Sequence, residues 1–192
     1  MHGSDKYLRC FLDQVCFNLE FPYSRRITLI LWRLNVLNQI DQWIDKTNLE
    51  YKDQRISCDK FASEFAGFYP TEFLKNAFYV VVDKIPKPDF PELREMGLGD
   101  FIDMDAAGVT YKNTYYMLSH VADNLRVHFH ELVHVAQWNN LGAEAFILRY
   151  ITEIQCAGYY DAPLEIMAYS LDEHFTDGRE KLNVVEYVAR TL

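Results

Sequence analysis

The stretch His128-Phe129-His130-Glu131-Leu132-Val133-His134-Val135-Ala136-Gln137-Trp138 contains the pattern His-Glu-x-x-His. Residues four apart on an α-helix lie one turn above each other, so His130 and His134 would present two imidazoles to one point in space. Glu131 lies about 100° round the helix from His130 and can reach a water molecule held at that point without binding a metal itself. The stretch therefore predicts a zinc-binding helix, with Glu131 in the position of a general base.

The same helix carries an apolar stripe at i, i+3, i+4 and i+7, formed by Phe129, Leu132, Val133 and Ala136. This spacing predicts that one face packs against the protein while the histidine face borders a cleft. A single helical histidine is more often a packed or exposed residue than a ligand. Two histidines at i and i+4, with a glutamate between them and a clean apolar stripe, favour the metal site over that alternative.

The chain has 192 residues, 49% of them hydrophobic and 15% aromatic, which predicts a folded globular protein with an aromatic-rich core. Its net charge of -9 and isoelectric point near 5.1 disfavour nucleic acid or an anionic membrane as the main partner. No basic segment followed by an apolar run opens the chain, and no apolar run is long enough to cross a bilayer. A cytoplasmic location is the expectation, and export by a non-classical route stays open.

The four cysteines, Cys10, Cys16, Cys58 and Cys156, form no C-x-x-C pair and no dense framework. Neither a disulfide scaffold nor a cysteine-based zinc ribbon is indicated. They are interpreted as mostly buried thiols.

The first third of the chain reads as helical. Apolar residues recur at helical spacing over residues 6–21 and again over residues 25–47, and a third helix is expected over residues 57–66. Nothing in these segments forms a catalytic grouping. We interpret residues 1–75 as an N-terminal helical extension packed on the core.

The residue composition changes after Asn76. Residues 77–82 are mostly β-branched and aromatic and predict a buried strand. The proline-rich residues 84–91 read as a surface connection. Residues 107–111 and 114–118 flank a turn at Lys112-Asn113 and predict a hairpin. A strand of this hairpin would line the cleft, where its unpaired edge could accept an extended peptide.

Three helices are predicted in the remainder of the chain. Asp123 or Asn124 would cap the helix that carries the metal motif, and this helix would stop near Gly142. A second helix is expected over residues 143–156, and Asp161 with Pro163 would open a third. The predicted fold class is therefore α+β, mostly helical, with a small zincin-like sheet preceding the metal helix in a domain over residues 76–192.

A catalytic zinc site needs a third protein ligand. The candidates are Glu165, His174, His128, His120 and, less favourably, Cys156 in an apolar helix. His128 precedes His130 by two residues and points about 200° away on the helix. Glu165 is favoured, because the intervening helix and loop could bring its own helix back against the first. A carboxylate in a first helical turn could instead simply compensate the helix dipole.

Several of these residues together resemble the pattern of a known family. The segment from His130 to Gln137, followed by Leu141-Gly142, Phe146 and Tyr150, and then by Ala162-Pro163-Leu164-Glu165 with Ala168-Tyr169, looks like the gluzincin zinc metallopeptidases. It is most similar to their small, largely uncharacterised peptidase domains from bacteria, over roughly residues 77–175. The resemblance implies Zn²⁺ as the cofactor, His130, His134 and Glu165 as its ligands, and Glu131 as the base.

The chain departs from that pattern at one position. Gluzincins often carry an acidic residue four positions after the ligand glutamate, where it orients a zinc histidine, but Tyr169 stands there in this chain. Asp172, about one turn further, is a possible substitute. Tyr159, Tyr160 and His174 are the candidates for a group that stabilises the tetrahedral intermediate.

The expected function is zinc-dependent hydrolysis of a peptide bond in a peptide or protein substrate, with Glu131 as the general base. The alternative is a catalytically inactive zinc-binding module for interaction or effector functions that retains the same site. No specificity pocket can be recognised from the sequence.

Overall fold

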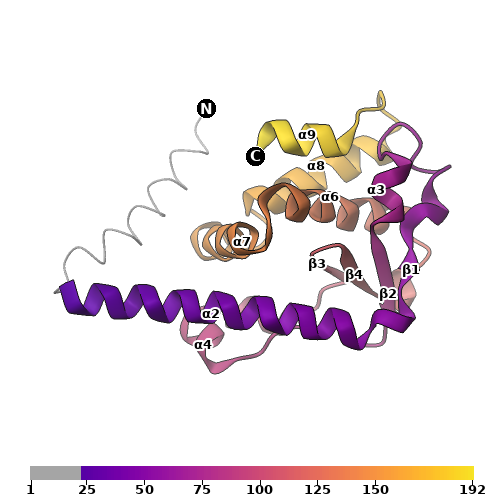
Figure 1. Cartoon of the computed structure of the whole chain (residues 1–192). Helices are drawn as coiled ribbons and strands as arrows, with labels where there is room; N and C mark the ends of the chain where they lie inside the picture. The colour runs from indigo at the N-terminus through magenta and orange to yellow at the C-terminus, as the bar shows by residue number, and fades with distance from the viewer. Residues whose placement is uncertain (1–22) are drawn as a thin grey trace.

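The computed structural model describes residues 23–192, so the helix predicted over residues 6–21 lies outside the described part of the chain. The described part is α+β, as predicted, with eight α-helices and a four-stranded sheet (Figure 1). The elements are α2 (Tyr23–Glu50), η2 (Lys52–Gln54), β1 (Ile56–Ser57), η3 (Cys58–Phe61), α3 (Thr71–Lys75), β2 (Phe78–Val82), α4 (Pro91–Glu95), α5 (Gly99–Asp103), β3 (Gly108–Tyr111), β4 (Thr114–Leu118), η4 (Ser119–Val121), α6 (Leu125–Leu141), α7 (Ala143–Ala157), α8 (Pro163–Thr176) and α9 (Val184–Thr191).

The strands lie in the order β1-β2-β4-β3. The central pair β2 and β4 is parallel, whereas β1 pairs with β2 and β3 with β4 in antiparallel fashion. The predicted hairpin is confirmed, with Tyr111 opposite Thr114 and Lys112 at φ 60° in the turn. Strand β3 therefore forms one edge of the sheet, and it contacts α6.

The sheet separates two apolar clusters, because successive side chains of a strand point to opposite faces. Tyr79 and Tyr115 pack with residues of α6 such as Phe129, while Val80 and Tyr116 pack with residues of α2 and α7. Helix α6, with α8 and α9 beyond it, covers one face, and α2 runs along the other (Figure 1). Residues on both sides of position 75 thus share one sheet and its core.

The predicted helix over residues 25–47 is confirmed as α2, which extends from Tyr23 to Glu50. The helix predicted over residues 57–66 is wrong. Ile56 and Ser57 instead pair with β2, and the hydroxyl of Ser57 accepts a hydrogen bond from the backbone N–H of Asp59 at the start of the short 3₁₀ helix η3. Phe61 and Phe65 lie in this irregular segment and are buried. Their spacing in the sequence therefore reflects packing in the core and not an α-helix.

The C-terminal helices agree with the sequence prediction in position and differ at two points. Ala162 is the N-cap residue of α8, in place of the expected Asp161. Helix α9 was not predicted, and it buries Val184 and Val188 against α6 and its neighbours. None of the helices in the described residues combines the length and apolar character needed to cross a bilayer.

The cysteines in the described part of the chain differ in state. Cys58 is a fully buried free thiol, and burial raises its pKa to about 12. Cys156 is disulfide-bonded, which corrects the interpretation of this residue as a thiol and removes it from the candidate metal ligands.

Candidate metal centre

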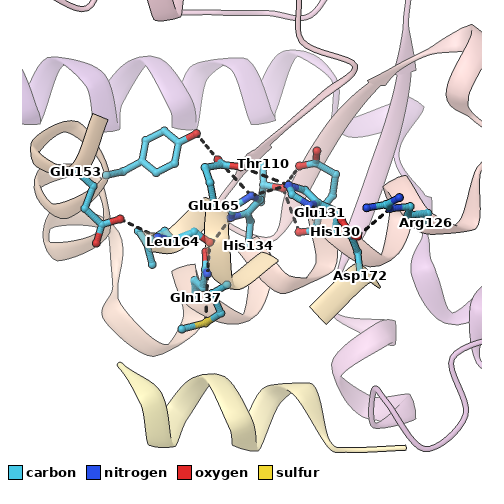
Figure 2. A network of polar contacts seen from close by, with 12 residues as sticks. Thr110, Arg126, His130, Glu131, His134, Gln137, Glu153, Leu164, Glu165 and Asp172 are labelled. Atoms are coloured by element: carbon cyan, nitrogen blue, oxygen red, sulfur yellow. Dashed lines mark hydrogen bonds and ion pairs between the residues drawn. The ribbon is translucent and has the colours of Figure 1, made fainter. Parts of the chain in front are cut away.

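Helix α6 places the two motif histidines one turn apart with their rings turned toward one point (Figure 2). The Nε2 atoms of His130 and His134 lie 3.2 Å apart, and the side chains are only 10% and 7% exposed. Every residue from His128 to Trp138 is buried, and His130 and Glu131 line a solvent-open cleft, as predicted for this face of the helix. The histidines therefore belong to a buried polar cluster inside the helical layer.

Glu165 completes the cluster from the first turn of α8. Its Oε1 lies 3.4 Å from Nε2 of His134, and its Oε2 lies 3.5 Å from Nε2 of His130. The chain returns to α6 through α7, and glycines with φ of 76° and 81° at Gly142 and Gly158 flank that helix, in a region of backbone space that favours glycine. The ligand atoms of the three residues all lie within 4.8 Å of one another.

The cluster fits a divalent cation. Oε2 of Glu165 is buried and has no hydrogen-bond partner, which is costly for a carboxylate oxygen unless a cation faces it. Although burial disfavours the charged imidazole, the neighbouring carboxylates of Asp172 and Glu165 raise the pKa of His130 to about 10. The carboxylates around these histidines thus stabilise positive charge between them, and two imidazole nitrogens with a carboxylate oxygen are donors that zinc prefers.

Asp172, about one turn after Tyr169 on α8, orients the first histidine. Its Oδ2 lies 2.9 Å from Nδ1 of His130, and its Oδ1 accepts from Nε of Arg126 at 2.8 Å. Tyr169 packs its ring against His130, with the ring centroids 4.6 Å apart. Asp172 therefore makes the carboxylate contact to His130 that Tyr169 cannot make. This is the replacement that was considered from the sequence.

Gln137 orients the second histidine, a role that the sequence analysis did not assign. Its Oε1 lies 2.8 Å from Nδ1 of His134, and its amide nitrogen donates to the carbonyl oxygen of Leu164 at 3.0 Å. Because the amide nitrogen is engaged there, the amide oxygen is left to accept from Nδ1–H, and Nε2 of His134 keeps its lone pair for a cation. The i, i+3 spacing from His134 was the available sequence signal.

Glu131 lies beside the cluster and is held by strand β3. Its Oε2 accepts from the hydroxyl of Thr110 at 2.6 Å, and the residue is buried. A Cβ atom on Gly108 would approach Oε1 of Glu131 to 2.4 Å, so only glycine leaves room for this carboxylate. Burial raises the pKa of Glu131. The residue is thus a positioned carboxyl group in an environment that increases its basicity.

Two tyrosines surround Glu165. The hydroxyl of Tyr150 donates to Oε1 of Glu165 at 2.7 Å, and Tyr159 lines the same region, where burial raises its pKa. The predicted helper Tyr160 is 70% exposed at the rim of a solvent-open cleft that His130 and Glu131 also line. Tyr159 and Tyr160 therefore line the same cleft as His130 and Glu131.

The structure does not bring His174 into the site. It follows Glu165 by nine residues, about half a turn out of phase, and its Nε2 lies 2.6 Å from the carbonyl oxygen of Glu180. His128 contacts Tyr115 with Nδ1 at 2.7 Å and lies in the core on another face of α6. His120 is exposed on η4. Of the candidates for the third ligand, only Glu165 faces the two histidines.

A comparison of the chain with protein-family models, curated proteins and solved structures finds no match. A function can therefore be inferred only from the geometry and chemistry of the cluster formed by His130, His134 and Glu165, together with the adjacent Glu131.

Proposed function

We propose that this chain is a zinc-dependent peptidase whose metal is held by His130, His134 and Glu165. The observation that supports it most strongly is the convergence of two Nε2 atoms, 3.2 Å apart, on the carboxylate of Glu165, whose buried Oε2 accepts no hydrogen bond. Catalytic zinc sites use three protein ligands and keep one position for water or substrate. The donor set has that number and those atom types.

Zinc and Glu131 would have separate roles in the hydrolysis. Bound zinc would acidify a water molecule and polarise the substrate carbonyl. Glu131 would take the proton from that water and pass it to the leaving amine, and such a base contributes about 10²- to 10⁴-fold to the rate. Thr110 holds the carboxylate of Glu131 in place through its 2.6 Å hydrogen bond, so the base needs little reorganisation.

Substrate would approach from the cleft that His130, Glu131 and Tyr159 line together with residues 104–108. Strand β3 begins at Gly108 and forms an edge of the sheet. An extended peptide could add to such an edge through backbone hydrogen bonds, which would place its carbonyl groups next to Glu131. This arrangement favours a peptide or protein substrate.

An inactive zinc-binding module would need the same three ligands. Such a module would not require a glutamate that is held by Thr110, has room for its carboxylate beside Gly108 and lines an open cleft. Glu131 is therefore the residue that separates the two functions, because it contributes to hydrolysis without binding the metal.

Glu131→Gln tests the proposal, with Glu173→Gln as a matched control on the exposed side of α8. The full-length chain is loaded with zinc, its metal content is measured, and a mixed-sequence peptide library is incubated with it and analysed by mass spectrometry. We expect one zinc per chain in all three proteins and loss of cleavage only in Glu131→Gln. Equal cleavage by parent and Glu131→Gln would refute the role of the base. Zinc binding by the parent without any cleavage would favour the inactive module.

A further inference from the structure

An apolar cavity of about 90 Å³ adjoins the candidate metal centre. Glu131, His134 and Glu165 contribute to its wall, so it reaches the ligands themselves. From there it extends between β3, α2, α7 and the segment over residues 87–106. Gly108, Glu131 and Tyr159 line both this cavity and the solvent-open cleft, and the two hollows therefore meet at the site of the base.

Large apolar side chains from several elements make up most of the cavity wall, among them Ile44, Leu98, Ile102, Trp138, Phe146 and Ile154. Lys87 also lines it, but its ammonium group donates to the carbonyl oxygen of Phe101 at 3.0 Å and to that of Met104. Both hydrogen bonds hold the segment over residues 87–106, which lines the cavity, in place. The remaining charged residues of the wall are those of the candidate metal centre.

The size and chemistry of the cavity indicate its occupant. A single water needs roughly 10–15 Å³ of such space, and apolar cavities with room for more tend to stay dry and to bind apolar molecules. Well-packed interiors contain few voids of this kind. A cavity that is apolar along its length and ends beside a general base is suited to hold an apolar group while the adjoining bond lies at the metal.

We infer that this cavity is the pocket for a large apolar side chain of the substrate, of the size of leucine, methionine or phenylalanine, next to the bond that is cleaved. The inference rests on the proposed function and adds a substrate class to it. Fit of one apolar side chain changes kcat/KM by about 10- to 200-fold. The chain should therefore cleave peptides with a large apolar residue at one position beside the scissile bond and disfavour alanine there.

Ile154 provides the test, because it lines the cavity, is only partly buried and lies on the same helix as the exposed Leu148. In the zinc-loaded full chain, Ile154→Trp should lower kcat/KM for a leucine peptide by about 10- to 200-fold and leave the matching alanine peptide unchanged. Leu148→Trp is the matched control and should behave as the parent. Ile154→Ala enlarges the cavity and should shift the preference toward larger side chains.

A binding measurement separates the cavity from the reaction. Saturation-transfer NMR on the metal-free full chain should detect N-acetyl-leucinamide but not N-acetylglycinamide, and Ile154→Trp should remove the leucinamide signal. If the parent cleaves no peptide but binds leucinamide in this way, the cavity is a site for apolar side chains and the proposed function is refuted. If peptides are cleaved with no preference for apolar residues and leucinamide does not bind, the cavity assignment is refuted while the proposed function stands.

Discussion

The Nδ1 atom of His134 lies 2.8 Å from the side-chain oxygen of Gln137, and the amide nitrogen of Gln137 reaches across to the carbonyl oxygen of Leu164 (Figure 2). Leu164 directly precedes Glu165. One buried amide thus orients a histidine of α6 and fixes the position of the first turn of α8. Two of the three proposed ligands depend on this single side chain.

Replacing Gln137 with Leu should lower the zinc affinity by about 10- to 100-fold, because His134 loses the partner that holds its ring and tautomer. Asn140→Leu, at an exposed position on the same helix, is the matched control and should keep the parent affinity. Competition with a chromophoric chelator measures both. Parent-like affinity in Gln137→Leu would show that this contact does not support the metal site.

Gly108→Ala should lower kcat by about 100-fold with zinc affinity unchanged, because the new Cβ would come within 2.4 Å of Oε1 of Glu131 and displace the base. Gly99→Ala is the control, since a Cβ at that position meets its nearest atom only at 3.9 Å. Steady-state kinetics and zinc titration of the two variants make the comparison. A fall in zinc affinity equal to the fall in kcat would mean that Gly108 serves the fold and not the base.

Glu153 fixes the start of α8 from α7, because its buried carboxylate accepts from the backbone N–H of Leu164 at 2.8 Å and from Nε of Arg149 at 2.7 Å. Glu153→Ala leaves that N–H unpaired and should cost about 1–3 kcal/mol of unfolding free energy. The exposed Glu173→Ala should cost far less. Urea denaturation of the metal-free chains measures this difference, and equal losses in the two variants would contradict the capping role.

Stability should fall in alkaline solution, partly through Cys58. Burial raises the thiol pKa from its ordinary value of 9.0 to about 12, so the unfolded chain loses this proton first. The contribution is complete below pH 9 and is lost as pH rises toward 12, which amounts to roughly 2 kcal/mol between pH 9 and 11. The unfolding free energy of Cys58→Ala should therefore depend less steeply on pH than that of the parent. Parallel pH profiles would show that the thiol does not contribute.

The sequence was sufficient for features that local spacing determines. His130, Glu131 and His134 were recognisable because four residues make about one helical turn. The hairpin was predicted from two β-rich runs around Lys112-Asn113 and is confirmed. Glu165 could be selected as a ligand only by comparing the candidate residues. Whether its carboxylate reaches the two histidines depends on how α7 and α8 pack against α6.

Long-range contacts account for what the sequence analysis missed. Residues 57–66 have apolar spacing compatible with a helix, but Ile56 and Ser57 pair with β2, and the segment continues as a short 3₁₀ helix and turns. The carboxylate of Glu153 on α7 accepts the backbone N–H of Leu164, which is the role expected of Asp161. The apolar cavity is formed by segments far apart in the chain, and no local pattern marks it.

The central claim is that one zinc ion is bound by His130, His134 and Glu165. Anomalous diffraction at the zinc edge from crystals of the full chain grown with zinc tests it most directly. We expect one strong anomalous peak about 2.0–2.2 Å from Nε2 of both histidines and from a carboxylate oxygen of Glu165. A peak elsewhere, or none at this cluster when zinc is in excess, would contradict it.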